Sequence, residues 1–458
     1  MTLPLAFLIA GLASLMLAIG LLGLHPESLV QYHYHQVTIA LVHLVVLGFL
    51  MSVVMGATYQ LVPVVLECQL YSPRLARWHL PIHLISVAGM VVSFWTWDMK
   101  NLGHFASGLV FGALLFVWNL GRTLHRSRRT NAVSVGIGFS LLWLLAVLGM
   151  GIAITAAKST YELVDQPGLN PLLLWPLARL QQLGAWVATF DAMAVMHAHA
   201  HLGILGVFVS ITMAVAYRLV PMFLVSEVQH PRRALASLLC VHAGVPLIVL
   251  TIATKSPWKP LAALPIAVGF ALYAWELAAI LAARRRLVID WALRAFLVSQ
   301  ASLAPAFLLG LALSWPGVQL TEFTGGLEGV YGTLAILAIP ALAILGMLHK
   351  ILPFLVWYGA YSRHLGTART PAVHEMYSPF ALFVCIGAFL VGLGLLCIAR
   401  LQGSLLTAQF GVGTLAVSML ALTLNCVLVL RHLVSPVLRP IEPLPSRAPA
   451  PTPTPARS

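Results

Sequence analysis

The sequence predicts an all-α integral membrane protein in which twelve transmembrane helices form three repeated four-helix units. Of the 458 residues, 60% are hydrophobic and only 9% are charged, whereas soluble proteins carry about 25% charged residues. Twelve apolar runs reach the length that a spanning helix needs, roughly 20 residues. A sequence motif also recurs in the second, sixth and tenth of these runs.

The apolar runs lack the short alternating pattern of an outer-membrane barrel, so each predicts a helix. The first has no positive residues before it and no small-residue cleavage site, which predicts a retained helix rather than a signal peptide. The predicted helices are 3–24, 36–66, 79–98, 103–122, 132–156, 187–224, 233–254, 260–283, 291–313, 328–358, 377–399 and 405–432. Together they form one membrane domain, 1–439, and the proline-rich segment 440–458 predicts a disordered cytoplasmic tail.

The basic residues predict the orientation of the chain. Of the 26 Lys and Arg residues, 20 lie in the segments that follow even-numbered helices or in the tail. Because basic loops stay in the cytoplasm, we expect a multi-pass protein of the bacterial inner (cytoplasmic) membrane with both termini inside. The net charge of +13 thus reflects the basic cytoplasmic loops of a protein whose partner is the lipid bilayer, and we expect no nucleic-acid binding.

The recurring motif places a histidine and a proline at a fixed spacing. In the second helix His43 precedes Pro63 by 20 residues, and in the sixth helix His201 precedes Pro221 by the same 20. A tyrosine stands four residues before each proline, and the tenth helix carries a weaker copy with Thr333 at the histidine position. Since 20 helical residues cover roughly 30 Å, each histidine should lie near one membrane face and each proline near the other.

Three histidines at alternate positions begin the sixth helix: His197, His199 and His201. Imidazole is costly to bury in hydrocarbon without a partner, so the cluster indicates a binding site. A helix turns about 100° per residue, which puts His199 and His201 on opposite sides and His197 on the side of His201. Two imidazoles from different helices can hold a six-coordinate b haem, whereas one leaves an open position for a diatomic gas. His43 occupies the depth and face of His201, so we predict these four histidines as haem or metal ligands.

The sixth helix resembles a known motif. Its residues His199-Ala-His201-Leu-Gly-Ile-Leu-Gly, followed by Tyr217-Arg-Leu-Val-Pro221, are similar to HxHxGxLG…LYxLIP in the catalytic subunit (subunit I) of haem–copper oxidases, most closely the cbb3 type. The resemblance implies one or two b haems, copper, and electron transfer with reduction or binding of O2 or NO. It also implies a cytochrome c or quinol electron donor and partner subunits. By residue, it implies that His199 ligates a high-spin haem and that His43 and His201 share a low-spin haem.

Other functions remain open because the pattern departs from that family. The motif stands on the sixth helix rather than the tenth, and the seventh helix has one histidine, His242, instead of an adjacent pair. A non-enzymatic haem- or copper-binding sensor, or a nitric-oxide response protein like NnrS, is the alternative to an oxidoreductase. A secondary transporter is a third class, although its repeats usually comprise six helices or are inverted.

Four further residues carry weaker predictions. Glu276, within the eighth helix, could serve a proton path or a helix–helix hydrogen bond. Arg400 could pair with haem propionates. His33 and His35, before the second helix, could be solvated loop residues or an additional ligand. The sequence has five cysteines but no CxxCH, so we expect no covalently attached haem in this chain.

Overall fold

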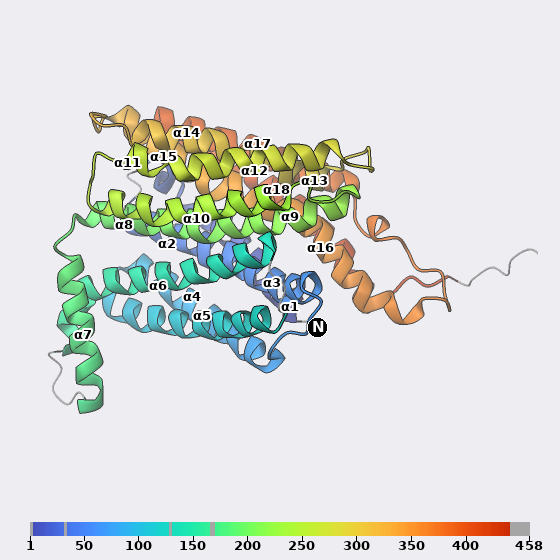
Figure 1. Ribbon diagram of the computed structural model, residues 1–458, viewed down its shortest axis with the longest axis horizontal. Helices are drawn as coiled ribbons and strands as arrows, with labels where there is room; N and C mark the ends of the chain where they lie inside the picture. Colours follow the sequence, from blue (N-terminus) through green and yellow to red (C-terminus); the bar gives the residue numbers. More distant parts are fainter. Residues whose placement is uncertain (1–2, 32–33, 128–130, 165–169, 440–458) are drawn as a thin grey trace, which may run out of the picture.

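The computed structural model describes residues 3–31, 34–127, 131–164 and 170–439. Within these residues, twelve helical spans are long and apolar enough to cross a membrane. This confirms the predicted all-α membrane fold. The spans lie alongside one another in an elongated bundle (Figure 1). The predicted tail, 440–458, lies outside the described residues.

Several spans are single unbroken helices: α1 (Leu3–Leu24), α4 (Pro73–Thr96), α5 (Met99–Ser127), α6 (Ala132–Val164), α10 (Pro231–Ala253), α17 (Pro379–Gln402) and α18 (Leu405–Val434). Two spans are broken near prolines, which lack the N–H that would continue the helical hydrogen bonds. These are α11 (Lys259–Ala262) with α12 (Leu264–Ala282), and α13 (Trp291–Ala301) with α14 (Leu303–Leu313). Short 3-10 helices lie in the connections: η1 (Pro26–Leu29), η5 (Ser362–His364) and η6 (Val373–Glu375).

The second, sixth and tenth spans each contain an eight-residue π-helix between two α-helical parts. The three π-helices begin directly after His43, His201 and Thr333, the three positions that the sequence motif aligns. Wide π turns inside α-helices are frequent at functional sites. The three spans consist of α2 (Gln36–His43), η2 (Leu44–Met51) and α3 (Ser52–Val65); α8 (Ala192–His201), η3 (Leu202–Val209) and α9 (Ser210–Leu224); and α15 (Glu322–Thr333), η4 (Leu334–Ala341) and α16 (Leu342–Tyr361).

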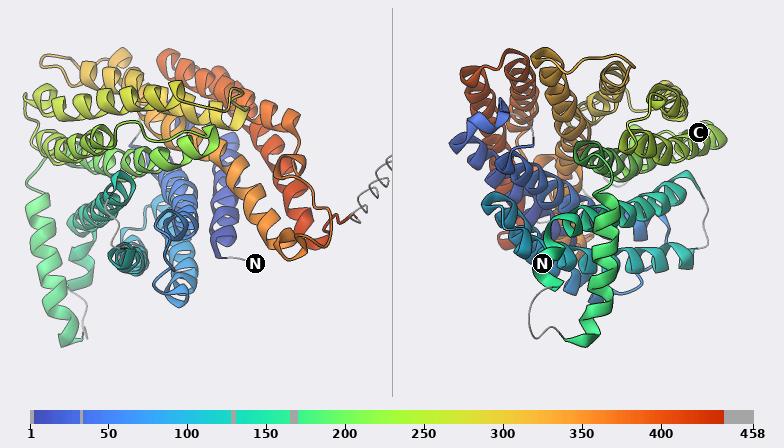
Figure 2. Two further views of the ribbon diagram at one scale, coloured as in Figure 1. Left: turned by 45° about the vertical axis from the view of Figure 1, so that its right-hand side comes forward. Right: turned by 90° about the vertical axis from the view of Figure 1, so that its left-hand side faces the viewer.

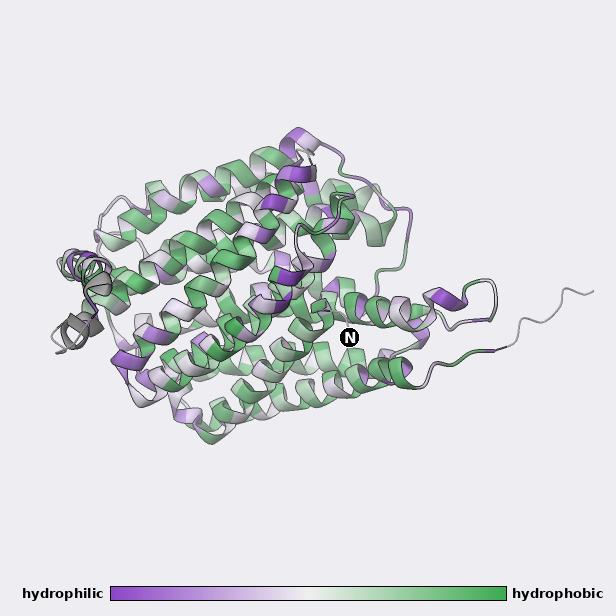
Figure 3. Ribbon diagram, turned by 90° about the horizontal axis from the view of Figure 1, so that it is seen from below, coloured by the Kyte–Doolittle hydropathy of each residue, from purple (hydrophilic) through white to green (hydrophobic). Residues whose placement is uncertain are grey.

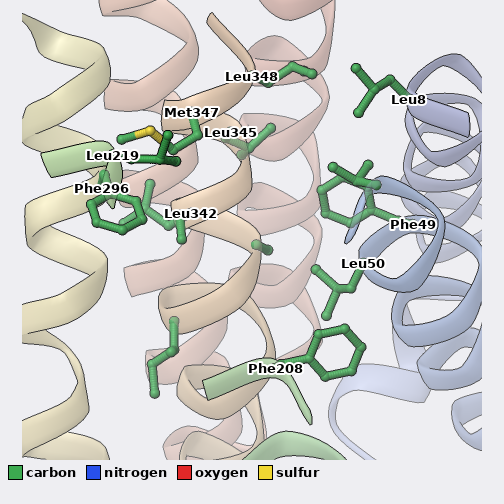
Figure 4. Close-up of a cluster of buried hydrophobic side chains, with 14 of the residues drawn as sticks. Leu8, Phe49, Leu50, Phe208, Leu219, Phe296, Leu342, Leu345, Met347 and Leu348 are labelled. Atoms are coloured by element: carbon green, nitrogen blue, oxygen red, sulfur yellow. The ribbon is translucent and has the colours of Figure 1, made fainter. Parts of the chain in front are cut away.

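These three spans form the centre of the bundle. In their most apolar stretches 61%, 67% and 56% of the residues are buried, against 44% or less in each of the other described spans. Phe49 and Leu50 of η2, Phe208 of η3 and Leu342 of α16 belong to one buried apolar cluster (Figure 4). The outer helices carry apolar residues along their lengths, and hydrophilic residues gather toward the helix ends and loops (Figure 3).

Two of the spans that follow a central span begin at a serine held by an asparagine of the next helix. Asn119 of α5 accepts a hydrogen bond from the backbone N–H of Ser72 at 2.9 Å, and Asn425 of α18 accepts one from Ser378 at 2.9 Å. Each asparagine also donates to the carbonyl of the same serine. Both side chains are buried, so these bonds fix the start of α4 and of α17.

Glu276 of α12 does the same for α10. Its carboxylate accepts hydrogen bonds from the backbone N–H groups of Gln229 and His230 at 2.7 and 2.9 Å, and from Nε of Arg233 at 2.8 Å. The residue is fully buried, and Arg233 is 12% exposed. Of the two roles that the sequence leaves open for Glu276, the structure shows the helix–helix hydrogen bond.

One helix was not predicted. The helix α7 (Pro171–Val187) stands across one end of the bundle and packs against α6 (Figures 1 and 2). At 17 residues with an internal proline it is too short and too interrupted to read as a span.

Three helices begin at other residues than predicted, in each case directly after a residue that caps the helix. The third helix begins at Pro73, after Ser72, and the tenth at Glu322, after Thr321. The sixth begins at Ala192 rather than at 187, because Asp191 caps it.

Candidate functional site

His43 is the last residue of α2, just before the π-helix η2. Nδ1 of its ring lies 2.8 Å from the carbonyl oxygen of Ile39. Since a carbonyl only accepts, Nδ1 carries the proton and the lone pair stays on Nε2. The ring stacks on Phe94 of α4, with the ring centroids 4.5 Å apart. Orientation by a backbone carbonyl is the usual arrangement of a metal-binding histidine.

His201 repeats this arrangement at the end of α8. Its Nδ1 lies 2.7 Å from the carbonyl oxygen of His197, so Nε2 again carries the lone pair. On the other side of the ring, the hydroxyl of Tyr331 lies 3.1 Å from Nε2. His201 therefore faces α15 of the tenth span.

His199 points away from His201, toward α6. A Cβ atom placed on Gly151 would stand 3.2 Å from Cε1 of His199, so the ring lies directly against that helix. The ring is also close to Val147 and within electrostatic range of His43. Its Nδ1 is buried and has no hydrogen-bond partner among the described residues, which costs about 1–3 kcal/mol.

The structure thus brings His43 near His199, whereas the sequence predicts a pair of His43 and His201. The opposite directions of His199 and His201 are as predicted. His201 faces the tenth span, whereas the ring of His43 lies against Phe94 of α4 and within electrostatic range of His199.

His197, the fourth predicted ligand, lies one turn before His201. Its ring centroid is 5.5 Å from that of Tyr34. Among the described residues, no group of three or more His, Cys, Asp or Glu side chains is placed to hold a metal ion. The described residues therefore do not fit a three-ligand copper site. His33, a further candidate, lies outside them.

His201 and Tyr331 lie in a mostly apolar pocket between the sixth and tenth spans, here called the His201 cleft. The cleft has few polar groups, which are His201, Tyr331, Lys259 and Ser314. Its other lining residues are Ile204, Leu205, Val209, Ile248, Ile252, Ala263, Ile266, Phe270, Leu303, Ala306, Phe307, Gly310, Leu311, Ala335 and Ile339. An apolar pocket with few convergent polar groups is the usual form of a small-molecule or cofactor site.

Tyr331 was missed by the sequence analysis. It stands two residues before Thr333, as His199 stands two residues before His201. The equivalent position in the motif could have indicated Tyr331. A tyrosine in an apolar helix, however, does not by itself indicate a binding site as a histidine does.

Other polar candidates have structural partners. His83 lies 3.0 Å from the hydroxyl of Ser52, and His242 accepts a hydrogen bond from the indole of Trp143 at 3.1 Å. Both stand beside the π-helices, because Ser52 directly follows η2 and Trp143 packs against Gly206 of η3. Arg400 donates to the carbonyl of Gln31 at 2.9 Å through Nη1, while its Nε is buried without a partner among the described residues.

Comparison with known proteins gives a match in structure but not in sequence. No family model and no curated protein matches the chain. Among solved structures, a haem–copper terminal oxidase dimer determined by cryo-electron microscopy superposes with a TM-score of 0.64 over 97% of this chain and 88% of that one, at 12% identity. The chain has the fold of a haem–copper terminal oxidase. This confirms the resemblance that the sixth helix suggests, at the level of fold.

Haem fits the residues of this oxidase-like fold. His43, His199 and His201 are only partly covered by neighbouring side chains. His43 and His201 present Nε2 lone pairs, and His199 has an unsatisfied ring nitrogen. These are the features expected of axial ligands in a membrane interior.

Proposed function

We propose that this protein is a haem-binding membrane protein that transfers electrons, with one b haem held between His43 and His199. The observation that carries the proposal is that these two imidazoles lie on central spans within electrostatic range of each other. Nε2 of His43 carries the lone pair, and Nδ1 of His199 has no hydrogen-bond partner among the described residues. When bound, haem supplies one-electron redox chemistry at its iron. Ile39 and Phe94 fix the ring of His43, and Gly151 leaves room for that of His199.

A second b haem would bind at His201 in the neighbouring cleft. Lys259 in the wall of that cleft provides a cation for a propionate carboxylate. Binding or reduction of O2 or NO would be the terminal step of the electron transfer. A cytochrome c or a quinol would donate the electrons, and partner subunits would complete a cbb3-like assembly. His197 would support His201 through its carbonyl group.

Three pseudo-equivalent four-helix units underlie this arrangement in our proposal. Supporting it, the residue directly before each of the π-helices η2, η3 and η4 stands 20 residues before the proline of the motif. The pairs are His43 and Pro63, His201 and Pro221, and Thr333 and Pro353. The tethers described above recur as well: Ser72 and Asn119 are 47 residues apart, and so are Gln229 and Glu276.

The proposed location is the bacterial inner membrane, with both termini in the cytoplasm. The distribution of 20 of the 26 basic residues supports this orientation. The histidine end of the bundle would then face outward. Tagging the ends of the chain with a reporter that is active on one side of the membrane tests it.

The experiment for haem is a haem assay and a reduced-minus-oxidised spectrum of the purified full chain. His43→Ala should lose the low-spin haem band. His104→Ala is the matched control, because the His104 ring makes the same bond to a carbonyl one turn back, at 2.9 Å from Lys100, but lies exposed on α5. Protein that carries no haem, when made in cells that supply it, would refute the proposal.

A second candidate is a non-enzymatic haem- or copper-binding sensor, or a nitric-oxide response protein like NnrS. It is favoured over a copper-dependent oxidase by one observation: the described residues bring no three metal-binding side chains together. Consumption of O2 or NO by the purified protein with a chemical electron donor separates the two. Catalytic turnover supports an oxidoreductase, and stoichiometric binding without turnover supports a sensor.

A further inference from the structure

Tyr331 and His201 contact each other directly inside the His201 cleft. The phenol oxygen of Tyr331 lies 3.1 Å from Nε2 of His201, and the two rings stack with centroids 5.6 Å apart and planes 24° from parallel. Because Nδ1 of His201 donates to the carbonyl of His197, Tyr331 must be the donor in the bond to Nε2. A phenol oxygen and an imidazole lone pair therefore point at each other across the boundary of two central spans.

The position of the Tyr331 ring is fixed by α14. A Cβ atom on Gly310 would stand only 2.9 Å from Cε2 of Tyr331. Glycine at 310 thus allows the ring to lie directly against that helix. The phenol oxygen is one of the few polar groups of a cleft that is mostly apolar.

Tyr331 also has a counterpart in the neighbouring site. It stands two residues before Thr333, after which η4 begins, just as His199 stands two residues before His201, after which η3 begins. In the first site, His43 of one span lies within electrostatic range of His199 of the next. In the second, His201 meets Tyr331 in the same relation. The two sites therefore offer two imidazoles and one imidazole with one phenol, respectively.

The geometry points to Tyr331 as the second iron ligand of a haem bound at His201, which makes this cleft an imidazole–phenolate site beside a bis-imidazole site. The inference rests on the proposed function, since it takes haem to be bound. Tyrosine is a known axial ligand of haem iron. To hold a haem iron between them, the phenol oxygen of Tyr331 and Nε2 of His201 would move apart from their present separation of 3.1 Å.

Ligation changes the protonation of Tyr331 but transfers no electron. On haem binding, the phenol O–H of Tyr331 would break, its oxygen would form a coordinate bond to ferric iron, and the proton would pass to solvent water. The phenolate would then offset part of the positive charge of the ferric iron. Axial ligand identity is a main determinant of haem spectrum and potential, so the two haems should differ in both.

The test is a resonance Raman and electron paramagnetic resonance study of the ferric full-length protein, with haem counted per chain. Wild-type protein should show phenolate–iron vibrations, and Tyr331→Phe should lose them completely. Tyr273→Phe is the control, since Tyr273 is equally interior, at 2% exposure, and its hydroxyl donates to Gln300 at 2.8 Å. Tyr331→His should convert the signal to a second bis-imidazole low-spin species.

Each outcome has a definite meaning. Loss of the phenolate vibrations in Tyr331→Phe but not in Tyr273→Phe supports the inference. Two haems without phenolate vibrations, or vibrations unchanged in Tyr331→Phe, overturn it. A single haem that depends on His43 and His199 also overturns it while leaving the proposed function intact. Protein without any haem overturns both.

Discussion

Cε1 of His199 lies 3.2 Å from the point where a Cβ atom on Gly151 would stand. This close approach joins the fifth span to the sixth at the level of the proposed haem. It also shows that the position of a candidate ligand is set by the absence of a side chain on a neighbouring helix. Gly151 is therefore part of the site, although it offers no polar group.

Gly151→Ala should weaken haem binding at the site of His43 and His199. The new methyl group pushes the His199 ring by a few tenths of an ångström, and a side chain forced from its preferred rotamer costs about 0.5–1.5 kcal/mol. We expect haem to be retained about three- to tenfold less tightly, measured by transfer to apomyoglobin. Gly149→Ala is the matched control, because nothing lies within 4 Å of its added Cβ. Equal haem loss in both variants would count against a steric role for Gly151.

Glu276→Gln should lower stability without changing the haem spectrum. Removing one partner of a buried ion pair leaves Arg233 uncompensated and costs about 3–5 kcal/mol. The measurement is thermal unfolding of the purified protein in detergent. Asp191→Asn, which breaks an exposed pair with Lys255, should shift the midpoint much less. If Glu276 instead served a proton path, the variant would keep its midpoint and lose turnover.

The sequence was sufficient for the all-α fold with twelve membrane spans. The apolar runs determine the spans, because hydropathy is a property of one helix at a time. The repeated motif marks His43 and His201, but the π-helices that begin after them were not predicted. The partner of each histidine could not be predicted in this way. A helical wheel gives the direction in which His201 points, but not which neighbouring helix stands there.

Tyr331 and Gly151 illustrate the same limit. Each contributes through a contact with a residue on another span, His201 and His199 respectively. Neither residue type signals a site by itself, since tyrosine and glycine are common in membrane helices. Glu276 differs, because a buried acid is conspicuous in the sequence, yet only the structure shows that its carboxylate holds the start of α10.

Asp191 should make the first turn of α8 sensitive to acid. Its side chain accepts a hydrogen bond from Lys255 at 2.5 Å and one from the backbone N–H of Ala194 at 2.9 Å. These bonds, with that from Lys255 the larger cause, lower the pKa of Asp191. A lowered carboxyl pKa stabilises the folded state above the ordinary Asp value of about 3.9, and the stabilisation is lost as pH falls through the lower folded value.

Hydrogen exchange of the first-turn amides of α8, corrected for intrinsic rates, measures this effect. Protection in the wild type should fall below about pH 4. Asp191→Asn should keep the cap at neutral pH, because asparagine caps as well as aspartate, and should lose the acid transition. Asp191→Ala should lose protection at every pH. An unchanged acid transition in Asp191→Asn would assign it to another group.

Single and double histidine variants should reveal which residues share a haem. If His43 and His199 hold one haem, His43→Ala and His199→Ala should each remove the same bis-imidazole low-spin signal, and the double variant should lose no more than either single one. Such non-additivity is expected of two residues that act through one bound group. His201→Ala should leave that signal in place and remove the second haem instead.

The pairing predicted from the sequence alone requires the reverse: His201→Ala would match His43→Ala, and His199→Ala would differ from both. The electron paramagnetic resonance spectra of these four ferric proteins therefore decide whether equivalent histidines face each other or face successive clefts, and the direct contact of His201 with Tyr331 leads us to expect successive clefts.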